Sequence, residues 1–139
     1  MTIKPRATGT ITPHLETEFG VVMAQVVGRV AGARGAVLTD RDGHAIDYAH
    51  DATAIDELDL QIAGAQCART LLAIEVVARR RGFDRNTVLV EASQGCLLGA
   101  TLPRTDDLTL VLVLRARAHL GLALREFERA CDELERMLA

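Results

Sequence analysis

Residues 54–82, AIDELDLQIAGAQCARTLLAIEVVARRRG, decide the fold because they predict one long helix with two apolar sides. Glu57 and Asp59 near its beginning suit the positive pole of a helix dipole, and the arginines at 79–81 suit the negative pole. Gly82 follows as a stop signal. We therefore expect a single helix over most of this stretch.

On a helical wheel at about 100° per residue, the apolar residues of this helix form two opposite stripes. The first stripe consists of Leu58, Ile62, Ala65, Leu72 and Val76, with Arg69 among them. The second stripe consists of Leu60, Gly64, Cys67, Leu71, Ile74 and Ala78. A helix on the surface of a monomer needs only one apolar stripe, so two stripes require cover on two sides.

One side of the helix can be covered by the protein's own sheet, and the other by the same helix of a second copy in a two-fold dimer. Alternatively, the first helix or the N-terminal tail covers the second side within one chain. Arg69 favours the first stripe as the interface between copies, because a charged head group reaches water at the rim of an interface. The other interpretation is that Arg69 extends to solvent from a stripe that faces the core.

The flanking sequence predicts two further helices and five strands. A first helix begins at Thr12-Pro13, an N-cap followed by proline, and ends near Gly32. Strands are expected at 35–39, 44–49, 87–92, 96–102 and 108–114, and a last helix from about residue 118 to the end of the chain. The turn at 40–43 contains Asp-Gly, a hairpin signal. The predicted fold is α+β, an α/β sandwich with a five-stranded antiparallel sheet, helices on both faces and the order α-β-β-α-β-β-β-α.

Composition favours one globular domain, expected at residues 12–139 after a flexible tail at 1–11. The formal net charge of -3 argues against nucleic acid as a partner. No continuous apolar run reaches the roughly 20 residues of a membrane span, so we expect no membrane insertion. The start of the chain lacks the apolar segment of a signal peptide, which makes the cytoplasm the expected location. Cys67, Cys96 and Cys131 are then expected to be buried, reduced thiols.

The sequence lacks the motifs of the common catalytic and metal sites. Its glycines are not followed by the lysine and hydroxyl residue of a phosphate-binding loop. Residues 40–43 suit a hairpin turn better than a calcium loop, because the glycine comes too early. His14, His44, His50 and His119 show no metal-ligand spacing with cysteine or carboxylate. The arginines at 79–81 could bind an anion but are more simply a solvated helix end. We expect no enzyme activity, no catalytic residue, no metal and no cofactor.

Three segments in this order resemble the Roadblock/dynein light-chain family, including its bacterial MglB-like members. They are the hairpin 35–43 (GAVLTDRDG), the strand 88–91 (VLVE) and the segment 119–125 (HLGLALR). The resemblance extends from Leu15 to Leu138. It implies one helix on one face of the sheet and two on the other. It also implies homodimers in which the middle helices pack together and the third strand pairs with its copy.

The resemblance further implies a non-catalytic homodimeric regulator or adaptor of a small Ras-like GTPase, bound through the paired middle helices. Residues expected at the dimer interface are Leu58, Ile62, Ala65, Arg69, Leu72, Val76, Val88 and Val90. Residues expected to contact the GTPase are Gln61, Gln66, Arg69 and Glu75. The alternative function is a structural scaffold subunit of a signalling or motor complex without direct GTPase contact. A ligand-sensing domain is a further alternative, for which fold analogy is the only argument.

Overall fold

The fold is built around two apolar strands, β2 (Ala33–Thr39) and β6 (Thr109–Arg115), which pair antiparallel at the centre of one sheet. The computed structural model describes residues 11–13, 18–82, 86–102, 105 and 108–138. The remaining strands are β1 (Ile11–Pro13), β3 (Ala45–Asp51), β4 (Thr87–Ala92) and β5 (Gly95–Thr101). The helices are α1 (Glu18–Arg29), α2 (Glu57–Arg80) and α3 (Leu120–Leu138). The strand order across the antiparallel sheet is β1-β3-β2-β6-β5-β4.

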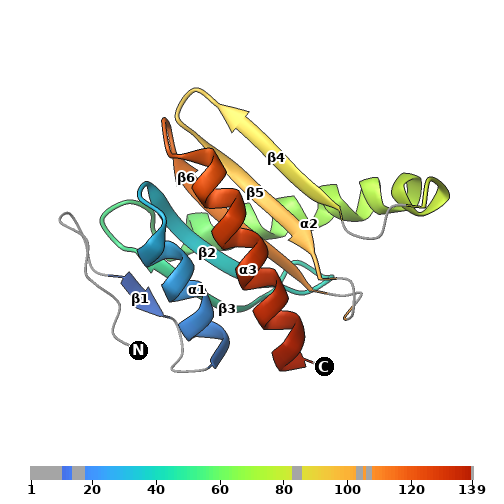
Figure 1. Ribbon diagram of the computed structural model, residues 1–139, viewed down its shortest axis with the longest axis horizontal. Helices are drawn as coiled ribbons and strands as arrows, with labels where there is room; N and C mark the ends of the chain where they lie inside the picture. Colours follow the sequence, from blue (N-terminus) through green and yellow to red (C-terminus); the bar gives the residue numbers. More distant parts are fainter. Residues whose placement is uncertain (1–10, 14–17, 83–85, 103–104, 106–107, 139) are drawn as a thin grey trace.

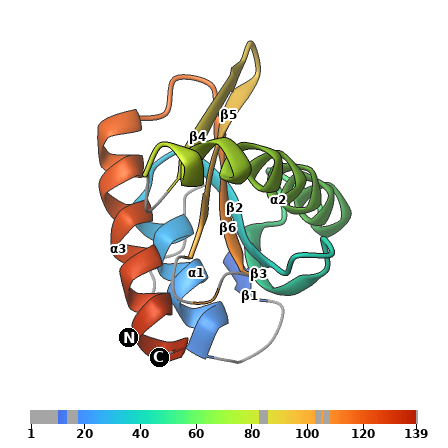
Figure 2. The ribbon, with the colours of Figure 1, turned by 90° about the vertical axis from the view of Figure 1, so that its right-hand side faces the viewer.

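The helices cover the sheet on both faces, with α2 on one face and α1 and α3 on the other (Figures 1 and 2). Each face has its own core because successive strand residues point to opposite sides. Leu38 and Leu112 face α1 and α3, where they join a core that includes Met23 and Phe127. Val37 and Val111, one position away, face α2. The predicted α+β fold, its element order and its two-sided helix cover are confirmed.

A sixth, short strand extends the sheet beyond the five that the sequence predicted. Thr12 of β1 pairs with His50 of β3, so the prediction that Thr12-Pro13 begins the first helix is wrong. Proline is tolerated on an edge strand because a missing N–H on the outer side interrupts no ladder bond. Residues 1–10, most of the predicted flexible tail, lie outside the described residues.

The start of α2 is capped by an aspartate side chain. The N–H of Asp59 donates to Oδ1 of Asp56 at 2.7 Å, which makes Asp56 the N-cap. Asp51 instead accepts bonds from the N–H and the hydroxyl of Thr53, at 3.0 and 2.6 Å. The carboxylate of Asp51 thus stabilises the turn that separates β3 from α2.

Candidate interaction surface on helix α2 and strand β4

The inner face of α2 packs directly on the sheet. Leu60, Cys67 and Leu71 are buried there against Val37 and Val111. Close approach depends on Gly64, where a β-carbon would lie 2.6 Å from Oγ1 of Thr39. The second apolar stripe is therefore the core-facing one, which decides a question that the sequence left open.

The outer face of α2 is largely apolar and, apart from the β2–β3 turn beside Ala65, uncovered within the described chain. Leu58 is 64% exposed, Val76 57% and Val77 59%. Ile62 and Arg69 are exposed as well, while Ala65 and Leu72 are half-buried. Most of the first stripe thus lies at the surface, and Val77 adds an apolar residue that the two-stripe pattern missed.

The C-terminal part of α2 projects past the edge of the sheet (Figure 1). Ile74, which belongs to the second stripe, is exposed, whereas Ala78 of the same stripe is buried. Arg80 and Arg81 at its end are also exposed, as expected for solvated charges. The projecting end carries Ile74, Val76 and Val77, an apolar surface with nothing beneath it in the described chain.

Strand β4 forms the sheet edge on this side. Its inner edge pairs with β5, and among the described residues no strand pairs with its outer edge. Leu89 and Val90 are exposed and Val88 is half-buried. An edge strand without proline, with a single charge at Glu91, is suited to pairing with another chain.

The four residues expected to contact a partner fall into two groups. Gln66 and Arg69 are exposed and together line a hollow of about 330 Å³ beside α2. Gln61 and Glu75 are half-buried. The side chain of Gln61 interacts with the hydroxyl of Tyr48 and so links α2 to strand β3.

Tyr48 of β3 holds the first turn of α2 in place. Its hydroxyl donates a hydrogen bond to the carboxylate of Glu57. Burial, followed by the interaction with Glu57, raises the pKa of Tyr48 to about 12. The Tyr48 hydroxyl therefore keeps its proton over the whole neutral range and can donate this bond to the first turn of α2.

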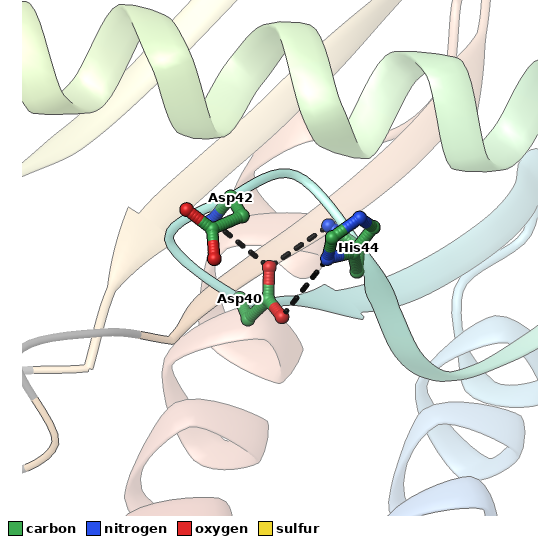
Figure 3. A group of neighbouring side chains, drawn as sticks. All are labelled: Asp40, Asp42 and His44. Carbon is green, nitrogen blue, oxygen red and sulfur yellow. Dashed lines mark hydrogen bonds and ion pairs between the residues drawn. The ribbon is translucent and has the colours of Figure 1, made fainter.

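The β2–β3 turn forms the other wall of the hollow beside α2. Oδ1 of Asp40 accepts the N–H groups of Asp42 and His44, both at 2.9 Å, as Figure 3 shows. Nδ1 of His44 lies 3.5 Å from Oδ2 of Asp40. Asp40, Asp42 and His44 stand close enough to share one metal ion, a spacing that the sequence analysis missed. The bonds within the turn already account for this arrangement, which is that of a hairpin turn as predicted.

Helix α2 is long and apolar enough over residues 57–78, by length and composition alone, to cross a membrane. This is weak evidence for a span, because helices in protein cores pass the same test. Here the apolar content comes from two faces, one of which packs on the sheet. Packing on the sheet does not account for the apolar residues of the outer face.

No protein-family model and no curated protein sequence matches this chain. Several solved structures have the same fold, among them a Roadblock/LC7 domain from Streptomyces avermitilis, with a TM-score of 0.72 and 20% identity over 85% of this chain and 95% of that one. The chain therefore has the Roadblock/LC7 fold, and the family resemblance is confirmed at this level.

Structures of MglB are also among them. Myxococcus xanthus MglB has a TM-score of 0.72 and 21% identity, over 88% of this chain and 96% of that one. The gliding protein MglB from Thermus thermophilus has a TM-score of 0.73 and 24% identity, over 85% of this chain and 86% of that one. At these identities the likeness concerns the fold.

Proposed function

We propose that this protein is a cytoplasmic, non-catalytic homodimer that serves as an adaptor or regulator of a small Ras-like GTPase. The observation that carries the proposal is the exposed apolar outer face of α2 beside the open edge of β4. Large exposed apolar residues gathered on one face mark interaction sites in soluble proteins. The Roadblock/LC7 fold, shared with MglB, supports the choice of partner class.

A second copy complements this surface through a two-fold axis at β4. Antiparallel pairing of β4 with its copy would continue the sheet across the dimer. The projecting end of α2 would then extend over the partner's sheet. On that face Val90, Leu97 and Val113 line a hollow of about 200 Å³, which the apolar side chains of Val76 and Val77 would fill.

The dimer would present its two α2 helices to the GTPase. Gln66 and Arg69 are exposed beside Leu58 and Ile62, so polar and apolar groups adjoin as in ordinary interfaces. Such a surface regulates by binding one conformation of the GTPase switch loops better than another. The adaptor needs to donate no catalytic group for this effect.

The test is binding of purified protein to Ras-like GTPases of the same genome, first those encoded beside its gene, each loaded with GDP or a non-hydrolysable GTP analogue. We expect one GTPase to bind with a preference for one nucleotide state. Absence of binding to every GTPase in both states would overturn the proposal. Co-purification with a kinase, motor or polarity protein instead would favour the scaffold function.

A further inference from the structure

A preformed hollow of about 330 Å³ lies between the β2–β3 turn and the middle of α2. Its lining residues are Arg41, Asp42, Gly43, Ala65, Gln66, Arg69 and Leu72. We infer that this hollow receives an acidic segment of the protein partner, whose carboxylates bind Arg41 and Arg69. The inference rests on the proposed function and names the chemistry of the partner at that surface.

The walls of the hollow are held rigidly. The turn is closed by the two N–H bonds to Asp40 and by Gly43, whose φ of +89° suits glycine. A β-carbon on Gly43 would lie 3.2 Å from the Cβ of Ala65, so the turn packs tightly on α2. The backbone of the turn therefore needs little reordering when a ligand binds, which favours a specific contact here.

The chemistry of the lining favours a carboxylate flanked by apolar groups. Guanidinium groups bind carboxylates through paired, charge-assisted hydrogen bonds. Arg41 comes from the turn and Arg69 from the helix, so two cations from separate elements line one hollow, and they outnumber its one carboxylate, Asp42. Leu72 and Ala65 add apolar surface beside them. Arginine is among the residues that most often dominate binding energy at interfaces.

A second copy of this chain suits the hollow less well than an acidic partner. In a two-fold interface, residues near the axis meet their own copies. Arg69 lies in the middle of the outer stripe, so helices paired there would bring two guanidinium groups together, which is unfavourable. The outer face of α2 is therefore divided. Its projecting end with Val76 and Val77 suits the second copy, and its middle suits an acidic partner.

The first test uses a short acidic peptide, acetyl-LEDEL-amide, titrated into the isotope-labelled protein while amide NMR resonances are recorded. We expect saturable shifts at residues 41–43 and 65–72, and none of comparable size with the neutral peptide acetyl-LQNQL-amide. Shifts confined to other surfaces, or equal shifts with both peptides, would overturn the inference. This readout does not require a GTPase.

The second test measures affinity for the GTPase that binds the wild-type protein. Arg41→Glu and Arg69→Glu should each weaken binding about tenfold or more, while the dimer persists in light scattering. Arg125→Glu is the matched control, since Arg125 is an exposed helical arginine on α3, across the sheet.

Unchanged affinity in both hollow variants would overturn the inference and leave the proposed function standing. If the acidic peptide shifts the amide resonances but no GTPase binds, the acidic partner would be supported and a GTPase as that partner would be rejected. Loss of the dimer in Arg69→Glu would assign the hollow to the second copy.

Discussion

Gly99 of β5 lies so close to Cys67 of α2 that a β-carbon on Gly99 would stand 2.2 Å from the sulfur of Cys67. Gly99→Ala should therefore destabilise the protein by about 1–3 kcal/mol, the usual cost of overpacking a core. Urea denaturation followed by circular dichroism measures this change. The double variant Gly99→Ala, Cys67→Ala should recover most of the loss, because the Cβ of Cys67 is 3.8 Å away. Equal stability of Gly99→Ala and wild type would refute the tight contact.

The contact between Gly99 and Cys67 also illustrates what the sequence could and could not predict. Periodicity predicted the element order and both apolar stripes of α2, because burial on a helix or strand repeats with a fixed spacing. It did not reveal which glycine allows α2 to approach the sheet, since that depends on strand register. Strand β1 was missed because Thr12-Pro13 suits a helix start locally, and its pairing with β3 is a long-range contact.

The candidate surface was predictable in part for the same reason. The wheel identified Leu58, Ile62 and Val76, and all three are exposed. It could not show that α2 projects past the edge of the sheet, nor that Ile74 of the second stripe is exposed. Nor could it place Arg41 beside Arg69, because the β2–β3 turn reaches α2 only through the tertiary fold.

Alkaline pH should destabilise the protein through Cys67. Burial raises the pKa of this thiol from 9.0 to about 11, so the folded state resists loss of the proton while the unfolded state does not. Folding stability linked to Cys67 is thus complete below pH 9 and is lost progressively towards pH 11. Denaturation midpoints measured between pH 8 and pH 11 should fall more steeply for wild type than for Cys67→Ala. Parallel curves would contradict this origin of the pH dependence.

His119 is expected to stabilise the last helix as its N-cap. Its Nδ1 accepts the N–H of Leu122 at 2.9 Å, and its carbonyl accepts the N–H of Ala123 at 3.0 Å. His119→Ala should cost about 1 kcal/mol in the free energy of unfolding, measured by urea denaturation. His119→Asp should retain or increase stability, because the first turn of α3 has no acidic residue and a carboxylate suits this pole of the helix. If His119→Asp lowers the free energy of unfolding as much as His119→Ala does, His119 does not stabilise α3 as an N-cap.

The proposed dimer predicts that charge on the edge strand β4 separates the copies without unfolding either one. Val90 and Val21 are exposed to almost the same extent, 46% and 45%, but Val90 lies on β4 and Val21 on α1, across the sheet. Val90→Lys should shift the molecular mass measured by light scattering from dimer to monomer, and Val21→Lys should not. Both variants should keep the wild-type circular dichroism, because neither side chain belongs to a core. Val77→Glu, at the projecting end of α2, should act like Val90→Lys, since both residues would face the second copy. A dimer that survives both Val90→Lys and Val77→Glu would place the interface elsewhere.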